Sequence, residues 1–118
     1  MRLLIVEDDI ALCQLWGRHL ARAGHEVTLC HDGRRAIDLL CVTGYDVIVL
    51  DLVLSSGSAL GVAEYAEVRQ PEAKVMFVTN TTFFSDGSIF ALNGNACAYL
   101  PTDTLPEDLA AMVEHHGR

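Results

Sequence analysis

Short apolar runs alternate along this chain with longer segments in which apolar residues recur at helical spacing. Three of the runs are continuously apolar, as in strands covered on both faces, whereas Glu26–Leu29 alternates, as in a strand near the edge of a sheet. Strands are therefore expected at Leu3–Val6, Glu26–Cys30, Val47–Leu50, Val75–Val78 and Ala96–Leu100. Strands that alternate with helical segments are typical of parallel βα units.

The segments after these strands predict five helices. They are expected over Leu12–Ala23 with Gly24 at its end, around Ile37–Cys41, from Ser58 to before Pro71, around Ser85–Asn93, and from Thr104 through Val113. The fourth pattern is the weakest because Gly87 and Gly94 interrupt it. The fifth opens with Thr104-Leu105-Pro106-Glu107, which predicts a capping box with proline in the first turn. The sequence thus predicts one α/β domain over residues 1–118.

Length and charge narrow the classes of protein to consider. At 118 residues and 51% hydrophobic content the chain has room for one core. A net charge of -8 with scattered basic residues argues against binding to nucleic acid or to an anionic membrane. No apolar stretch approaches the roughly 20 residues of a membrane span, and no signal-peptide pattern is present, so a cytoplasmic location is expected. The cysteines, Cys13, Cys30, Cys41 and Cys97, form no CxxC pair and are expected to be buried thiols.

Two of the apolar runs stop on acidic residues, and polar side chains follow two others. The residues at these strand ends are Glu7, Asp8 and Asp9, then Asp51, then Thr79 and Asn80, then Pro101, Thr102 and Asp103. Ligands of an open parallel sheet gather beyond the carboxyl ends of its strands, so these side chains are expected to share one site. Carboxylates and a hydroxyl suit Mg²⁺, which takes few protein carboxylates and keeps several waters. Such an ion would also relieve the repulsion between the acids.

A purely structural explanation of the same residues stays open. An aspartate after a strand is often a turn or a helix cap, and Asp9 has the position of an N-cap for the first helix. Thr79 alone could satisfy nearby backbone groups at a strand end. Two acidic strand ends and a hydroxyl at a third make capping a less complete explanation.

Four stretches together resemble the receiver domain of two-component response regulators. They are Leu4–Asp9, Asp46–Leu54, Val78-Thr79 and Ala98–Leu100, in order and close to the family's usual spacing over the whole chain. The resemblance implies a flavodoxin-like, doubly wound parallel sheet of order 2-1-3-4-5 with five helices. It also implies a phosphoacceptor signalling domain rather than an enzyme. The phosphoryl group would come from a histidine kinase or a phosphotransfer protein.

The resemblance further implies roles for individual residues. The Mg²⁺ ligands that it implies are Asp8, Asp51 and the backbone carbonyl of Val53, with Glu7 reaching the ion through water. Asp51 is also the expected phosphoacceptor. Thr79 is expected to hydrogen-bond a phosphoryl oxygen. Tyr99 is expected to be an aromatic switch, although a half-buried ring at a strand end is an equally good interpretation.

The chain departs from the family pattern at the lysine that usually follows the switch aromatic by three residues. Thr102 stands at that position and Asp103 replaces the proline after it. The only lysine, Lys74, precedes the fourth predicted strand and is therefore expected at the opposite edge of the sheet. Mg²⁺ would then meet the phosphoryl charge alone, so slower or weaker phosphorylation of Asp51 is expected.

Three further departures fall near the expected site. Ser55 and Ala59 replace the proline and glycine that are usual in the loop after the phosphoacceptor. Asn80 stands where a small residue usually leaves room for the phosphoryl group, so access is expected to be narrower. With the replaced lysine, these positions describe an atypical member of the family.

The expected function is that of a stand-alone, atypical receiver that signals through a downstream partner protein, since no output domain follows within the 118 residues. The alternative is a pseudo-receiver, a protein-interaction module that works without phosphorylation. The missing lysine favours the pseudo-receiver, whereas the intact Glu7, Asp8, Asp51 and Thr79 favour the receiver. A metal-dependent hydrolase is disfavoured, because there is no further general acid or base and no glycine-rich phosphate loop.

Overall fold

Five parallel strands form one sheet in the computed structural model, which describes residues 1–79 and 94–117. The strands are β1 (Arg2–Val6), β2 (Glu26–Cys30), β3 (Val47–Asp51), β4 (Lys74–Val78) and β5 (Ala96–Leu100). Their order across the sheet is β2-β1-β3-β4-β5, as the resemblance implies. Every predicted strand is confirmed to within one residue at each end, and the alternating strand β2 lies at an edge.

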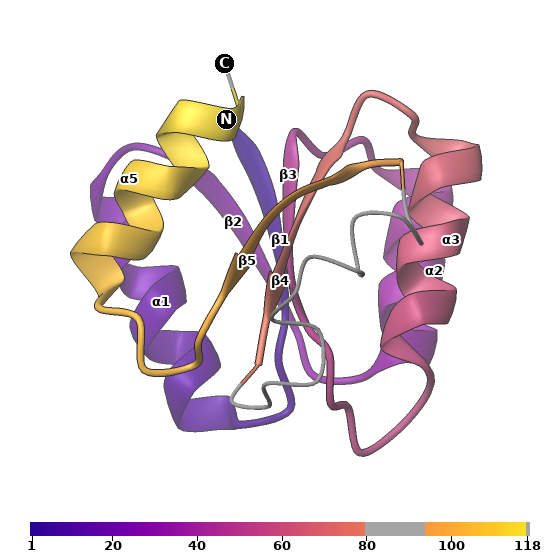
Figure 1. Ribbon diagram of the computed structural model, residues 1–118, viewed down its shortest axis with the longest axis horizontal. Helices are drawn as coiled ribbons and strands as arrows, with labels where there is room; N and C mark the ends of the chain where they lie inside the picture. Colours follow the sequence, from indigo (N-terminus) through magenta and orange to yellow (C-terminus); the bar gives the residue numbers. More distant parts are fainter. Residues whose placement is uncertain (80–93, 118) are drawn as a thin grey trace.

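Four helices belong to the described residues and cover the sheet from both sides (Figure 1). They are α1 (Ile10–Arg22), α2 (Gly33–Val42), α3 (Ala59–Arg69) and α5 (Pro106–Gly117). Helices α1 and α5 pack on one face, and α2 and α3 pack on the other. The helix expected around Ser85–Asn93 and the residue Asn80 lie outside the described residues. Within the described ranges, no helix is long and apolar enough to cross a membrane.

The sheet divides the hydrophobic core into two halves. Alternate residues of β1 and β3 point to opposite faces, so Leu4 and Ile48 join the cluster under α2 and α3. Leu3 and Val49 join the cluster under α1 and α5. Both strands are therefore buried on both faces, which explains why their sequences are continuously apolar. Trp16 of α1 is only 1% exposed and belongs to the second cluster.

Two of the expected helix ends are present. Asp9 is the N-cap of α1, and its side chain accepts a hydrogen bond from the Leu12 N–H at 3.1 Å. Gly24 follows the same helix with a φ of 96°, in the left-handed region that glycine enters without steric cost. Its N–H donates to the Ala21 carbonyl at 3.0 Å, which satisfies one of the last carbonyls of the helix.

The predicted capping box at the start of the last helix is wrong. Helix α5 begins at Pro106, with proline in the first turn as expected, but the Thr104 hydroxyl donates to the Pro101 carbonyl at 2.6 Å. The carbonyl of Leu105, the residue after Thr104, accepts the first helical bond from the Leu109 N–H at 3.0 Å. The threonine therefore closes the turn after β5 instead of capping α5.

Two side chains that the sequence places on buried helix faces are exposed. Cys41 is exposed at the surface of α2, although Cys13 and Cys30 are buried as expected, and burial raises the pKa of the Cys13 thiol to about 11. Leu15 of α1 is 44% exposed. Cys41 directly follows the buried Leu40, and Leu15 directly precedes the buried Trp16, and successive residues turn about 100° around a helix. The apolar stripe is thus narrower than the sequence pattern suggests.

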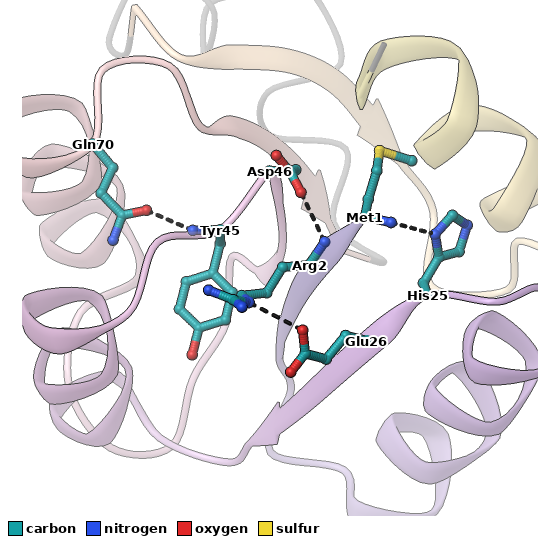
Figure 2. A network of polar contacts seen from close by, with 7 residues as sticks. All are labelled: Met1, Arg2, His25, Glu26, Tyr45, Asp46 and Gln70. Atoms are coloured by element: carbon teal, nitrogen blue, oxygen red, sulfur yellow. Dashed lines mark hydrogen bonds and ion pairs between the residues drawn. The ribbon is translucent and has the colours of Figure 1, made fainter.

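Polar contacts tie together the amino ends of the first three strands (Figure 2). The Arg2 N–H donates to Asp46 Oδ2 at 2.7 Å, which links β1 to the residue before β3. The Arg2 side chain pairs with Glu26 of β2 at 3.1 Å. The Met1 amino group lies 3.2 Å from His25 Nδ1. These contacts fix the strand register at the edge of the sheet opposite the acidic strand ends.

Gln70, directly after α3, joins two helices and a strand at the same edge (Figure 2). Its side-chain oxygen accepts from the Tyr45 N–H at 2.9 Å, just before β3. Its side-chain nitrogen donates to the Leu40 and Thr43 carbonyls at 2.8 and 2.6 Å, at the end of α2. Its own carbonyl accepts from the Asn95 side chain at 3.0 Å, next to β5. One side chain thus satisfies the end of α2 and the start of β3 together.

Candidate functional site

The acidic ends of β1 and β3 meet at the carboxyl edge of the sheet. Val6 pairs with Leu50, so the residues that follow them lie side by side. One carboxylate oxygen from each of Glu7, Asp8 and Asp51 lies within 4.8 Å of the others. The convergence expected from the sequence is therefore present in the structure. It follows from topology, because parallel neighbours end at the same edge.

A backbone N–H orients each of these carboxylates. The Val53 N–H donates to Asp51 Oδ1 at 3.0 Å. The Asp9 N–H donates to Glu7 Oε1 at 3.1 Å, and the Ser55 N–H donates to Asp8 Oδ2 at 3.0 Å. Within the described part of the chain, the buried Glu7 Oε2 has no hydrogen-bond partner. A buried oxygen of this kind is costly unless an ion, a proton or water satisfies it.

Burial changes the acidity of two of these groups. Glu7 is 3% exposed, and burial, together with the charges of Asp51 and Asp8, raises its pKa to about 8 against the opposing Asp9 N–H. Burial also raises the pKa of Asp51, and the Val53 N–H partly offsets this effect. The site therefore retains a proton near neutral pH when no cation balances its charge.

A cavity of about 400 Å³ opens over these carboxylates. Its lining residues are Glu7, Asp8, Asp9, Leu12, Asp51, Val53, Thr102 and Asp103. None of these is basic, and the sequence between residues 80 and 93 also contains no lysine, arginine or histidine. Lys74 is the first residue of β4 and so lies at the opposite edge of the sheet, as expected. Thr102 and Asp103 face the same cavity as the acids.

Thr79 and Tyr99 come from the neighbouring strands. Thr79 follows β4 directly, one residue beyond Val78, which pairs with Asp51. It is 2% exposed, and its N–H donates to the Leu100 carbonyl at 3.0 Å. Tyr99 of β5 is half-buried and packs against the cluster under α2 and α3. The structure thus places Thr79 beside the phosphoacceptor candidate and Tyr99 on the next strand.

The sequence interpretation missed two contacts of the site. His31, directly after β2, lies with Nδ1 3.1 Å from the Glu7 carbonyl, which makes the imidazole the donor. The same strand-end criterion that identified the acids also applies to His31, so the signal was present in the sequence. The Ser55 N–H bond to Asp8 has no such signal, because it depends on the path of the loop after β3.

The residues of the site fit a hard divalent cation. Three carboxylates converge, one of their oxygens is buried without a hydrogen-bond partner among the residues that the structure describes, and oxygen ligands suit Mg²⁺. Two unit charges 4 Å apart repel by roughly 4 kcal/mol at an effective dielectric of about 20, so a cation relieves a substantial cost. All three carboxylates could contribute to such a site, and Glu7 is the most buried of them.

A parallel sheet of order β2-β1-β3-β4-β5, with acidic groups at the carboxyl ends of β1 and β3, defines a doubly wound α/β protein of the flavodoxin-like class. Residues 3–114 match the family model for the response regulator receiver domain, so the chain belongs to that family. Receiver domains are phosphoacceptor signalling domains of two-component systems.

Comparisons with individual proteins agree with this assignment. The response regulator MprA of Mycobacterium avium (strain 104) is 30% identical over 113 residues, which are 96% of this chain and 49% of that protein. The chain thus spans about half the length of the curated relatives that it matches. A CheY-like receiver domain from Methanospirillum hungatei JF-1 superposes with a TM-score of 0.89 at 25% identity, over 98% of this chain and 92% of that one. The non-phosphorylated HemR receiver domain from Leptospira biflexa has the same fold, with a TM-score of 0.87 at 23% identity, over 98% and 93%.

Proposed function

We propose that this receiver domain accepts a phosphoryl group on Asp51 from a histidine kinase or a phosphotransfer protein, and signals through a partner protein. The observation that carries the proposal is the convergence of the Glu7, Asp8 and Asp51 carboxylates beneath an open cavity. In the transfer, an Asp51 carboxylate oxygen bonds to phosphorus while the phosphorus–nitrogen bond of the donor phosphohistidine breaks. The leaving imidazole keeps that electron pair and takes up a proton.

Asp8, Asp51 and the Val53 carbonyl are the proposed Mg²⁺ ligands, with Glu7 acting through water. When bound, the ion would offset the charge of the carboxylates and of the phosphoryl group, which carries about -1.5 to -2 charges. The Val53 N–H fixes the rotamer of the Asp51 side chain through Oδ1. Burial keeps water away from the inner side of the cluster, so these charges interact strongly there.

Thr79 and Tyr99 are proposed to report the phosphorylated state. The position of Thr79 beside Asp51 suits a hydroxyl that donates to a phosphoryl oxygen. Tyr99 pairs with Phe77 across the β4–β5 ladder, on the strand next to this threonine. A movement of the threonine would therefore reach the tyrosine through one pair of neighbouring strands.

We propose that the site is atypical because Thr102 occupies the lysine position of the family. Thr102 and Asp103 both line the cavity, and no basic side chain lines it within the described residues. A phosphoryl group there would meet Mg²⁺ as its principal positive charge. Phosphotransfer is therefore expected to be slower than in a receiver with the lysine, and more dependent on Mg²⁺.

The test is the intact mass of the protein after incubation with Mg²⁺ and acetyl phosphate, a small phosphodonor. The wild type is expected to gain one phosphoryl group, and the Asp51→Asn variant is expected to gain none. An adduct of equal yield in both proteins would show that another residue accepts the group. Absence of any adduct, with beryllofluoride also failing to bind, would reject phosphoacceptance.

The acidic lining of the cavity supports a second candidate function, that of a pseudo-receiver. Thr102 stands at the position of the family's lysine, and Asp103 adds a negative charge at the position of the proline that usually follows it. In this case the partner binds the unphosphorylated domain, and the carboxylates hold a metal or only stabilise the fold. The two functions separate in the mass experiment, because the pseudo-receiver gains no phosphoryl group.

A further inference from the structure

Ser55 makes a contact to the site that the family pattern does not allow. Its backbone N–H donates to Asp8 Oδ2 at 3.0 Å, across 47 positions of sequence. The family usually has proline at this position, and proline has no N–H to donate. This bond therefore depends on a residue that distinguishes the chain from its family.

The rest of the loop is held against the first turn of α2. The Gly33 N–H donates to the Ser56 carbonyl at 2.9 Å. Gly57 has a φ of 81°, and a Cβ added there would lie 2.9 Å from the Gly33 Cα. The two backbones thus pack directly against each other, and the left-handed turn favours glycine. This packing fixes the position from which Ser55 reaches Asp8.

The bond leaves Asp8 ready to hold a cation. The Ser55 N–H holds the Asp8 carboxylate through Oδ2, and one oxygen of this carboxylate lies within 4.8 Å of an oxygen of Glu7 and of Asp51. Carboxylates that ligate metals are usually hydrogen-bonded in turn, and loss of such an outer partner typically costs about 10–100-fold in metal affinity. The N–H dipole also brings partial positive charge to a cavity whose lining includes five acidic residues and no basic one.

We propose that the Ser55 backbone N–H is a positioning group for the metal site. It orients Asp8 for Mg²⁺, and it brings partial positive charge to a site that lacks the family's lysine. The inference rests on the proposed function, because it assumes that Asp8 ligates the ion. It assigns a specific consequence to the replacement of proline by Ser55. The serine hydroxyl has no part in it.

The test compares Ser55→Pro with Ser55→Ala, because alanine keeps the N–H and proline removes it. We expect the proline variant to bind Mg²⁺ about tenfold more weakly by calorimetry, and the alanine variant to bind like the wild type. The melting temperature of each metal-free protein is measured in parallel. If the proline variant melts earlier but binds Mg²⁺ unchanged, the bond is only structural and the proposal is wrong.

A second measurement covers the case in which the proline variant does not fold. In the wild type, the Ser55 amide proton is expected to exchange slowly with solvent and to shift in the NMR spectrum when Mg²⁺ is added. Fast exchange, or a resonance that Mg²⁺ leaves unchanged, would contradict the proposal. If the wild type itself binds no Mg²⁺, the proposed function fails, whereas binding that is insensitive to the proline variant overturns only this inference.

Discussion

Glu7 is a carboxyl group enclosed by protein and by two further acids. Its pKa of about 8 in the folded chain lies above the ordinary value of 4.5. The protonated form is therefore favoured by folding, and this stabilisation is complete below the unfolded pKa and is lost as the pH rises through about 8. The free energy of unfolding of the metal-free protein is expected to fall across that interval, as measured by urea denaturation.

The Glu7→Gln variant isolates this effect because glutamine has a similar shape and no ionisable proton. Its free energy of unfolding is expected to fall less between the two pKa values of Glu7 than that of the wild type. Parallel pH profiles of the two proteins would contradict the assignment of the proton to this group. Mg²⁺ competes with the proton, so its affinity for the wild type is expected to rise with pH.

Thr102 lines the acidic cavity and occupies the position where the family usually has a lysine. The Thr102→Lys variant is expected to be labelled by acetyl phosphate about tenfold faster, which corresponds to about 1.4 kcal/mol of transition-state stabilisation. Thr102→Met is the matched control, because methionine adds length without charge. The measurement is the rate of mass gain at a fixed Mg²⁺ concentration. No acceleration by lysine, or equal acceleration by methionine, would argue against the claim that the missing positive charge at position 102 slows phosphotransfer.

The helices and strands meet at Gln70 on the opposite edge of the sheet. Replacing it by leucine would leave the Leu40 and Thr43 carbonyls and the Tyr45 N–H without their partner. The Gln70→Leu variant is expected to lose about 2–3 kcal/mol of unfolding free energy in urea. The exposed Glu72 gives a control, since Glu72→Leu is expected to change stability little. If both variants lose the same unfolding free energy, Gln70 does not anchor α2 and β3 through these hydrogen bonds.

The strands could be predicted from the sequence because burial on both faces leaves a continuous apolar signal. The edge position of β2 was also predictable, since its residues alternate. Details at the ends of elements were less predictable. The Thr104 hydroxyl donates to the Pro101 carbonyl instead of capping α5, because tertiary geometry selects among local hydrogen bonds of similar strength. Cys41 is exposed although it follows the apolar pattern of α2.

The site was predictable as far as topology determines it. Parallel strands place their acidic ends together, so Glu7, Asp8 and Asp51 could be grouped from sequence. His31 could have been grouped with them, since it directly follows β2, but its partner could not be named from the sequence. The Ser55 N–H contact could not be derived at all, because it depends on the path of the loop after β3. The raised pKa of Glu7 likewise follows from burial, which the sequence indicates only indirectly.

The whole molecule carries a net charge of -8, and its acidic cavity concentrates part of that charge. Mg²⁺ is therefore expected to stabilise the fold, by about 2.7 kcal/mol when it is present at about a hundred times its Kd. The Asp8→Asn variant is expected to be more stable than the wild type without metal, because one repulsive charge is gone. It is also expected to gain less from Mg²⁺. Thermal unfolding with and without the ion measures both effects.

The Asp8→Asn variant is expected to be more stable without metal and to gain less stability from Mg²⁺, and this combination distinguishes lost charge from disturbed packing. A variant that only disturbs packing would lower the melting temperature without metal. If Asp8→Asn lowers that temperature and retains the full gain from Mg²⁺, the acidic cluster neither repels internally nor holds the ion.

The central claim is that a Mg²⁺-dependent phosphoacceptor lies at the carboxyl edge of the sheet. The most direct measurement is the mass of the intact wild type after exposure to acetyl phosphate, with Mg²⁺ present in one sample and chelated in the other. We predict one phosphoryl adduct with Mg²⁺ and none after chelation. An adduct that forms equally well in the chelated sample, or none in either, would contradict the account.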